Sequence, residues 1–348
     1  MRCLLIISGG YSVKKSAYEG FLSNNWSVRQ IMFRDFFDPY INSFITRFES
    51  MPGRVKKTWK GPYIRRINKE YLKVLNEEKP DLVFIYNNQF LLPSTVSAFK
   101  RSCKVVFILG DNPLYTPTNP YNVEILKFAD YIISPDTFWI NQLETLGIKN
   151  VFFDCFSYSS EEYFNFSPTR EQVDKFGSDL VYIGAAHKSN WGYKRFLFLN
   201  QFNNKDIKIF LNGDGYKARW KELFPELESK IIKHDTYDQR FNNIVYNCSK
   251  IAPIELVPSL FNGIHIRVFD VLGAGIFPLC EYSKDLETLF QGLDVPFVRN
   301  YYEAEGLANY LLEDDAYRLN LVRQMKERVD YTHNPAIVIG RMLDKVFS

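Results

Sequence analysis

Apolar residues in this chain form short runs that alternate with longer stretches of helical spacing. Five early runs have the length of a single β-strand: RCLLIIS, SVRQIMF, DLVFIY, KVVFIL and DYIISP. Between two of them, Ile64, Ile67, Tyr71 and Leu75 recur at the spacing of one helix face. Strands that are apolar throughout are buried on both faces, so the pattern predicts a doubly wound parallel sheet.

The same alternation restarts after a polar, turn-rich stretch that ends near Ser178. The later strand-like runs are DLVYIG, IKIFLNG, KIIKH, KIAPIEL, GIFPLC and PFVRN. A chain of 348 residues can form two domains, each with its own core. We therefore predict an N-terminal domain over 1–160, a linker over 161–176 and a C-terminal domain over 177–330. The remaining 331–348 should contain a helix beginning at Pro335, which either completes the last domain or crosses back to the first.

Both halves thus read as Rossmann-like domains of the α/β class. Two facing domains of this kind place the carboxyl ends of both sheets around a central cleft. Open α/β sheets bind their ligands at that edge, so the cleft is where we expect the functional site.

Charge and cysteine usage narrow the class of protein. The formal charge of +3 is nearly neutral for this length and argues against general nucleic-acid binding. The five cysteines are scattered and form no CxxC pair, which favours reduced thiols and a cytoplasmic location. No apolar run reaches the roughly 18 residues of a membrane span, and the N-terminal run lacks a cleavage site.

The segment from Phe261 to Phe290 is the most informative for chemistry. Helical spacing over 265–272 leads into a Gly-Ala-Gly turn, a buried strand and a second helix that Ser283 can cap. Arg267 and Asp270 share one face near the start of the first helix, where the dipole favours phosphate. A cation for a diphosphate beside a carboxylate for ribose hydroxyls suits a sugar nucleotide.

This segment resembles the donor-site signature of the spore-maturation-type (CgeB-like) glycosyltransferases, in the wider group 1 class with the GT-B fold. The shared pattern is R-x-F-[DE]-x-x-x-x-G, followed by an apolar strand and a helix ending in LF. Three further stretches resemble that family in the same order: GDNP at 110–113, ADYIISPD continuing into ETLGIKNV, and SDLVYIG with the basic helix after it.

The resemblance implies roles for residues on the donor side. Asp270 would bind the nucleotide ribose, and Arg267 would bind a donor phosphate. The other residues that it places around the donor are Gly184, Lys188, Arg195 and Gly213. Many retaining group 1 enzymes carry a glutamate eight residues before the ribose carboxylate. This chain has Asn262 there, which leaves the stereochemical outcome open.

The remaining candidates have two interpretations each. Asp111 follows a strand, so it either starts a turn before Pro113 or acts as the general base for an acceptor hydroxyl. His187 either takes part in catalysis or is an exposed loop residue, and His265 either lines the donor site or is an ordinary helix residue. On the acceptor side, a glycine turn follows the first strand and consists of Gly9, Gly10 and Tyr11.

One region, 54–73, is densely basic. It is either a solvated helix face or a patch that contacts anionic membrane at the inner face of the plasma membrane. No recognised nucleic-acid module accompanies it, so nucleic acid is a poor fit. The histidines and carboxylates show no metal-binding spacing, and we expect neither a metal nor a cofactor.

Together these features predict a metal-independent, hexosyltransferase-like enzyme that moves a sugar from a nucleoside-diphosphate sugar to a saccharide or lipid-linked acceptor. The expected setting is bacterial surface polysaccharide or glycoconjugate synthesis. Two other functions remain open. One is a sugar-nucleotide 2-epimerase of the same fold, which needs no acceptor. The other is a non-catalytic, two-lobed sugar-binding protein.

Overall fold

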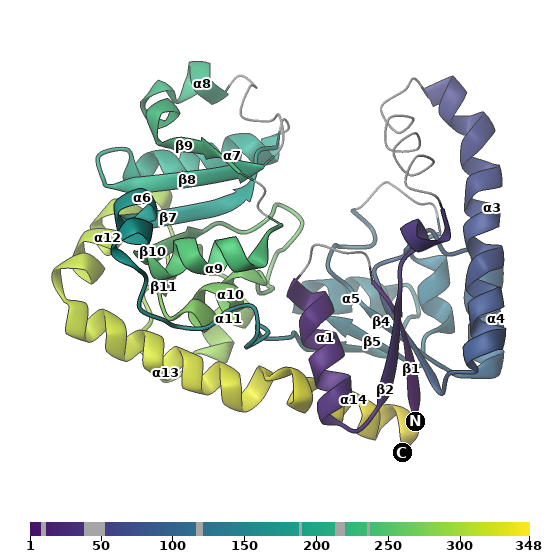
Figure 1. The fold of residues 1–348 in the computed structure, drawn as a ribbon. Helices are drawn as coiled ribbons and strands as arrows, with labels where there is room; N and C mark the ends of the chain where they lie inside the picture. The colour runs from purple at the N-terminus through teal and green to yellow at the C-terminus, as the bar shows by residue number, and fades with distance from the viewer. Residues whose placement is uncertain (8–11, 38–52, 116–120, 188–189, 213–219, 235–236) are drawn as a thin grey trace. The chain divides into compact units, whose positions relative to one another are not determined.

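The computed structural model describes residues 1–7, 12–37, 53–115, 121–187, 190–212, 220–234 and 237–348; of 53–60 and 221 it describes the backbone. The chain forms two compact units (Figure 1). The first unit comprises 1–155 and 336–348, and the second comprises 156–335. Each unit contains one β-sheet.

The first unit is built on a six-stranded parallel sheet in the order β2-β1-β3-β4-β5-β6. Its strands are β1 Arg2–Ile6, β2 Ser27–Ile31, β3 Leu82–Tyr86, β4 Lys104–Ile108, β5 Tyr131–Ser134 and β6 Val151–Phe153. The chain passes from β1 to β2 toward one side of the sheet and from β3 to β4 toward the other side. The carboxyl ends of β1 and β3 therefore flank the switch point, where open sheets of this kind bind ligands.

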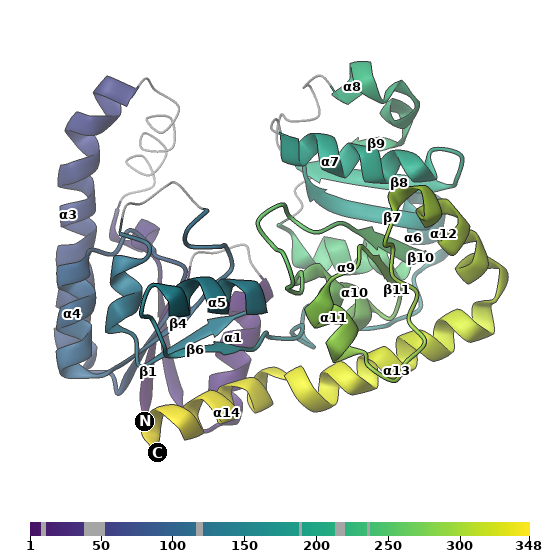
Figure 2. The same ribbon diagram turned by 180° about the vertical axis from the view of Figure 1, so that it is seen from behind.

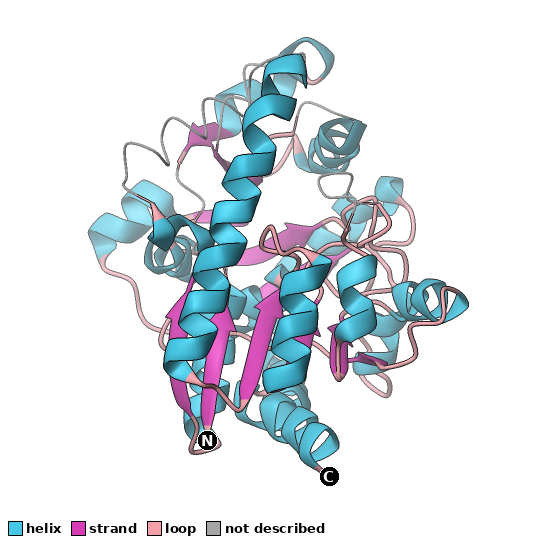
Figure 3. Cartoon of the chain, turned by 90° about the vertical axis from the view of Figure 1, so that its right-hand side faces the viewer, coloured by secondary structure: helices cyan, strands magenta, loops and turns pink. Residues whose placement is uncertain are grey.

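Helices cover this sheet as the apolar strands require. The helices of the unit are α1 Ser12–Ser23, α3 Gly53–Glu78, α4 Pro93–Ser102, α5 Thr137–Thr145 and α14 Pro335–Phe347, with 3-10 turns η1 Phe33–Phe36 and η2 Glu124–Phe128. Figure 3 shows α3 and α4 lying in front of the strands, on one face of the sheet. The β3 residues from Leu82 to Ile85 have no exposed surface, which confirms that this strand is buried on both faces.

Helix α14 is fixed to the first unit by charge and by packing. Arg341 donates two hydrogen bonds to the Asp154 carboxylate, at 2.9 and 2.8 Å, just beyond β6. Val338 and Ile339 are fully buried, and the Phe347 ring packs on Trp26 with 5.5 Å between ring centroids. The last helix of the chain therefore completes the unit that contains the first strand.

The second unit has a five-stranded parallel sheet in the order β11-β10-β7-β8-β9 (Figure 2). Its strands are β7 Ser178–Ala185, β8 Ile207–Asn212, β9 Ile231–Lys233, β10 Ser249–Ile254 and β11 Phe277–Cys280. Its helices are α6 Arg170–Phe176, α7 Asn190–Leu199, α8 Trp220–Leu223, α9 Gln239–Asn247, α10 Arg267–Ala274, α11 Lys284–Leu289, α12 Ala304–Glu313 and α13 Asp315–His333, with 3-10 turns η3 Asn200–Phe202, η5 Pro225–Lys230 and η6 Tyr301–Glu303. Here the switch point lies between β7 and β10.

The helix that the donor signature predicts is α10, and its ends follow local sequence. Gly275 ends the helix in the left-handed conformation, with φ of 84°, as glycine commonly does at this position. The next helix, α11, begins where Ser283 accepts a hydrogen bond from the Leu286 amide at 3.3 Å, so the expected cap is present.

Two stretches differ from the sequence reading. PFVRN was expected to be a strand, but in the structure it forms only an isolated parallel bridge between Val298 and Glu281. The stretch 161–176 lies inside the second unit, and its end forms α6, where Thr169 and Gln172 make a capping box. The residues that precede α6 also belong to this unit, and they include the buried aromatic rings of Phe156, Tyr158 and Tyr163.

Candidate functional site

The candidate site lies at the carboxyl edge of the second sheet, between β7 and β10. Strand β10 contains Pro253, which has no N–H to donate to the ladder. Strand β10 pairs with β7 through Ser249 and Ile251, and this pairing ends before the proline. Beyond it, the chain continues into Glu255, so a carboxylate stands directly at the switch point.

Glu255 holds two guanidinium groups. It is fully buried, and its Oε1 accepts from Arg195 Nε at 2.6 Å and from Arg267 Nη2 at 3.2 Å. Arg267 Nη2 also reaches Oε2 at 3.3 Å. Burial alone would raise the pKa of Glu255, but the two arginines more than offset burial and lower this pKa to about 2. The carboxylate is therefore ionised at neutral pH.

The two arginines differ in exposure. Arg195 on α7 is 2% exposed, and its guanidinium also donates to the Ala185 carbonyl at the end of β7. Arg267 is partly exposed and donates to the Ile183 carbonyl at 3.3 Å. Of these two cations, Arg267 is therefore the one placed to reach a ligand, while Arg195 lies behind it.

Tyr182 contacts both arginines and the Glu255 carboxylate that they share. Its hydroxyl donates to Glu255 Oε1 at 3.2 Å, and its ring lies 4.9 Å from the Arg267 guanidinium and 5.4 Å from that of Arg195. Cations over an aromatic face are attracted by its quadrupole. Burial raises the pKa of Tyr182 to about 12, although both arginines act against this, so the phenol stays protonated.

An aromatic pair borders the cluster at the start of α7. The rings of His187 and Trp191 stack with centroids 3.8 Å apart, and the Trp191 ring lies 5.4 Å from the Arg195 guanidinium. The Trp191 indole N–H is buried and meets no acceptor among the described residues. A buried N–H group without an acceptor can donate a hydrogen bond to an oxygen or nitrogen atom of a ligand. Gly192 permits this geometry, because a Cβ there would meet the His187 carbonyl oxygen at 1.9 Å.

Both histidines at the site are neutral. Burial and the charge of Arg195 lower the pKa of His187 to about 4. His265 lies just before α10, and burial with the charge of Arg267 lowers its pKa well below the usual range. Its Nδ1 accepts from the Arg267 amide at 3.1 Å, which assigns the ring proton to Nε2. Two arginines, one carboxylate and neutral imidazoles leave an excess positive charge.

Three further residues of the predicted donor side are Asp270, Asn262 and Gly184. Asp270, one turn into α10, is 6% exposed and raises the pKa of Tyr163 and of Tyr246, so it lies near both phenols. Asn262 is half-buried, and its carbonyl accepts from the Asp285 amide at 2.8 Å. Next to Gly184 the Tyr182 ring fills the space, since a Cβ there would come within 2.6 Å of the hydroxyl.

Five predicted site residues lie outside the described residues: Gly9, Gly10, Tyr11, Lys188 and Gly213. Their roles stay predictions. On the first unit, Asp111 follows β4 and accepts from Asn87 Nδ2 at 2.9 Å. Asp111 is exposed as a residue. Partial desolvation of its carboxyl group raises the pKa of Asp111, and the Asn87 hydrogen bond acts against this rise.

Sequence reasoning missed Glu255, Tyr182 and Trp191. Glu255 carried a visible signal, because a charged residue directly after the buried run KIAPI marks the carboxyl end of a strand. Tyr182 lies within the apolar run DLVYIG, where a tyrosine reads as core. Nothing local in the sequence reveals that its hydroxyl meets a carboxylate 73 positions away.

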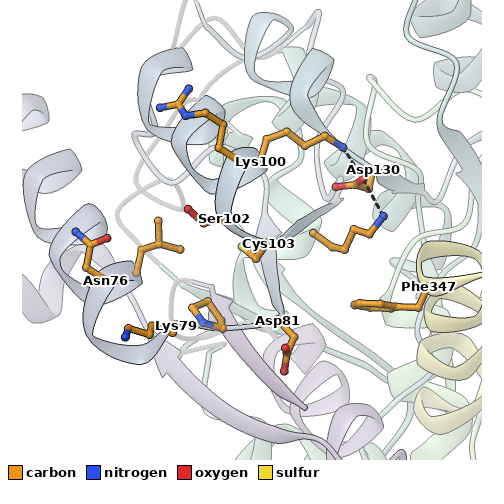
Figure 4. A pocket seen from close by; sticks show the side chains of 12 residues that line it. Asn76, Lys79, Asp81, Lys100, Ser102, Cys103, Asp130 and Phe347 are labelled. Atoms are coloured by element: carbon orange, nitrogen blue, oxygen red, sulfur yellow. Dashed lines mark hydrogen bonds and ion pairs between the residues drawn. The ribbon is translucent and has the colours of Figure 1, made fainter.

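A pocket of about 740 Å³ lies at the edge of the first sheet that is opposite to Asp111 (Figure 4). Its carboxylates serve the structure: Asp130 pairs with Lys100 at 2.5 Å and Lys104 at 3.7 Å, and Asp81 accepts from the Arg2 amide. This pocket surrounds the amino-terminal ends of β3 and β4, whereas open α/β sheets bind ligands at their carboxyl ends.

The described part of the chain has no side-chain cluster for a metal ion and no helix for a membrane span. Within it, no three His, Cys, Asp or Glu side chains gather as a metal site requires. None of its helices is long and apolar enough to cross a membrane. All five cysteines are free thiols, and every one except Cys103 is buried.

Comparisons with known proteins identify the fold. Residues 195–344 match a family model described as glycosyl transferase-like. A search of curated proteins found no match to the sequence. Sucrose-phosphate synthase from Thermosynechococcus elongatus matches over 100% of this chain and 99% of its own, with a TM-score of 0.67 and 12% identity.

Two further solved structures have the same architecture. HepE from Anabaena, solved with UDP-glucose, has a TM-score of 0.63 at 12% identity, covering 100% of this chain and 99% of that one. A putative UDP-N-acetylglucosamine 2-epimerase from Listeria monocytogenes has a TM-score of 0.56 at 11% identity, covering 99% and 94%. The chain therefore has the GT-B fold, and the resemblance to the group 1 glycosyltransferases expected from the Arg267 motif is confirmed.

Proposed function

We propose that this chain, which has the GT-B fold and matches the glycosyl transferase-like family over 195–344, transfers a sugar from a nucleoside-diphosphate sugar to an acceptor hydroxyl. The observation that carries the proposal is the cluster of Arg195, Arg267 and Glu255 at the switch point of the second sheet. An excess positive charge at that edge suits a diphosphate.

Arg267 is the group that we assign to the donor phosphate. Its planar fork is fixed by Glu255 on one side and by the Tyr182 ring on the other, so little side-chain freedom is lost when an anion binds. Arg195 adds charge from behind the carboxylate. Asp270 on the same helix as Arg267 would accept from the ribose hydroxyls, and the Trp191 indole N–H would donate to a ligand oxygen.

The transfer step follows from these assignments. The acceptor hydroxyl oxygen forms a bond to the anomeric carbon, while the bond from that carbon to the diphosphate oxygen breaks. The acceptor proton passes to a base, for which we propose Asp111. The charge that develops on the departing diphosphate is stabilised by Arg267 and Arg195. Because both groups are charged before the reaction, they need little reorganisation.

The proposed acceptor is a saccharide or a lipid-linked saccharide of a bacterial surface polysaccharide or glycoconjugate. The basic helix α3 supports the lipid-linked form: beyond the part whose side chains are not described it carries Arg65, Arg66, Lys69 and Lys73. All four of these residues are exposed. Such a face suits peripheral contact with anionic lipid at the cytoplasmic side of a membrane.

A thermal-shift screen against UDP, GDP, dTDP, ADP and CMP and their sugar conjugates tests donor binding. One nucleoside diphosphate should raise the melting temperature in proportion to the logarithm of its concentration. Arg267→Lys keeps the charge but loses the fork, so affinity should fall about tenfold. Arg299→Lys, an exposed arginine paired with Glu287, is the control and should bind as the parent does.

Incubation of the identified donor decides among the three functions. Release of nucleoside diphosphate that depends on an added acceptor supports the transferase. Conversion of the donor to an isomer without acceptor would instead make the protein an epimerase. Stable binding with neither reaction would make it a non-catalytic sugar-binding protein, and no binding by folded protein would refute the donor site.

A further inference from the structure

The backbone that carries Glu255 is paired on one side only. The pairing of β10 with β7 ends before Pro253, which has no N–H to continue it. The pairing of β10 with β11 continues as far as Ile254 and Cys280. The main-chain pairing that reaches Glu255 therefore comes from the β11 side, where Glu281 directly follows the strand.

Glu281 holds the chain on both sides of Glu255. Its own N–H donates to the Ile254 carbonyl at 2.9 Å, and its Oε2 accepts from the Leu256 amide at 2.8 Å. A carboxylate makes a stronger hydrogen bond with a backbone N–H than a neutral acceptor does. Because the two contacts enclose a single residue, they fix the direction in which the Glu255 side chain leaves the sheet.

Two further side chains hold Glu281 in this position. Lys194 Nζ donates to Glu281 Oε2 and to the Leu256 carbonyl, both at 2.8 Å. The Tyr301 hydroxyl donates to the same Oε2 at 3.1 Å. Burial and the charge of Glu281 raise the pKa of Tyr301, so the phenol stays protonated and can donate. Leu256 is thus bound through both its N–H and its C=O.

Helix α7 links this network to the charged cluster. Lys194 and Arg195 are consecutive on the helix, and they reach Glu281 and Glu255 at the ends of two neighbouring strands. Lys194 offsets the charge of Glu281, so this pair adds no net charge to the site. Its effect on a bound anion must therefore pass through the position of Glu255.

We propose that Glu281 is a positioning residue of the donor site, which fixes the backbone on both sides of Glu255 and thereby orients Arg267 toward the donor diphosphate. This role rests on the proposed function and adds a residue to its site. Arg267 Nη2 contacts both carboxylate oxygens of Glu255, at 3.2 and 3.3 Å. A shift of the Glu255 backbone would disturb both contacts together.

A double-mutant cycle on nucleotide affinity tests this role. Calorimetric titration of the full chain uses whichever of UDP, GDP, dTDP and ADP gives the largest thermal shift. Glu281→Ala should weaken binding about tenfold in the parent protein. In Arg267→Lys, which lacks the fork that Glu255 orients, the same change should weaken binding less than about threefold. Glu281→Gln keeps an acceptor for the Leu256 amide and should restore most of the affinity.

Glu305→Ala is the matched control. Glu305 also pairs with a lysine of the same unit, Lys205, at 3.3 Å, but this pair lies near the amino end of β8. Its loss should leave nucleotide affinity unchanged. If Glu281→Ala does not fold, Lys194→Met takes its place in the cycle, because it removes the donor to the Leu256 carbonyl.

Urea denaturation provides a second cycle that needs no nucleotide. The losses of unfolding free energy in Glu281→Ala and Glu255→Gln should be less than additive, whereas those in Glu305→Ala and Glu255→Gln should add.

Two results would overturn the positioning role while the donor site stands: Glu281→Ala binds nucleotide as the parent does, or it weakens binding by the same factor in Arg267→Lys. The second of these would show a general effect on the fold. If no nucleotide binds the parent protein, the transferase proposal fails, and the stability cycle alone decides whether Glu281 positions Glu255. Additive losses in that cycle would refute the role.

Discussion

At the scale of single residues, Glu255 decides whether the site is stable without a ligand. Glu255 is fully buried, and its single negative charge offsets one of the two guanidinium charges beside it. The guanidinium group of Arg195 is also buried. Removing one member of a buried ion pair leaves the other charge uncompensated, which typically costs about 3–5 kcal/mol. Glu255 thus acts through the arginines, as a positioning residue.

Glu255→Gln should therefore lower the free energy of unfolding by about 3 kcal/mol or more, measured by urea denaturation. Glu287→Gln is the matched control. Glu287 also accepts from an arginine, Arg299, at 2.6 Å, but both side chains are about half exposed and screened by solvent, so the loss should be much smaller than for Glu255→Gln. Equal losses in the two variants would show that the buried cluster has no special part in stability.

How far the sequence predicts this site depends on the range of each contact. Arg267 and Asp270 were found because their spacing on one helix and the glycines after them are local. The partners of Arg267 come from other strands: Glu255 follows β10, and Tyr182 lies in β7. Long-range pairing of this kind depends on strand order, which no local pattern contains.

At the scale of elements, helix α10 carries Arg267 and Asp270, and its end fixes their position. Gly275 has φ of 84°, and a Cβ there would meet Asn165 Nδ2 at 2.2 Å and its Cβ at 3.0 Å. Gly292 has the same φ, but a Cβ there would meet nothing within 4 Å. Alanine substitutions at the two glycines therefore distinguish the cost of backbone strain from the cost of steric conflict.

Gly292→Ala should cost about 1–2 kcal/mol of unfolding free energy, the usual penalty of a left-handed alanine. Gly275→Ala should cost more, because the clash with Asn165 is added to the same strain. It should also weaken nucleotide binding, since α10 must shift to relieve the clash. Urea denaturation and the nucleotide thermal shift measure the two effects. Equal cost and unchanged binding in both variants would contradict the assignment of α10.

Elements themselves were largely predictable, because an apolar run or a helical face is a local property. All five early runs and five of the six later ones form strands. The exception, PFVRN, has the composition of a strand, but its proline removes a donor and only Val298 makes a bridge. Whether the helix at Pro335 completes the second unit or joins the first could not be decided from spacing. That outcome depends on Arg341 meeting Asp154, a contact across 187 positions.

At the scale of the whole molecule, the chain divides into two units, each with its own sheet and core. The proposed donor groups all belong to 156–335, whereas Asp111 and the loop that joins β3 to α4 belong to the first unit. Ligand binding stabilises the elements that it contacts more than distant ones, so each ligand should leave a separate protection pattern.

Hydrogen exchange with mass spectrometry should show this division. A bound nucleotide should slow amide exchange at the carboxyl ends of β7 and β10 and across α10, because the proposed donor site contains Arg267 and Asp270. A bound saccharide acceptor should instead slow exchange in 87–92 and 109–113. Asn68 donates to the Phe90 carbonyl in the loop after β3, and the Gly110 amide in the turn after β4 donates to Asn87 Oδ1. If the nucleotide protected only the first unit, the assignment of donor and acceptor would have to be reversed. Arg267→Lys should reduce the protection by the nucleotide and leave the protection by the saccharide acceptor unchanged, because Arg267 and the acceptor side belong to different units.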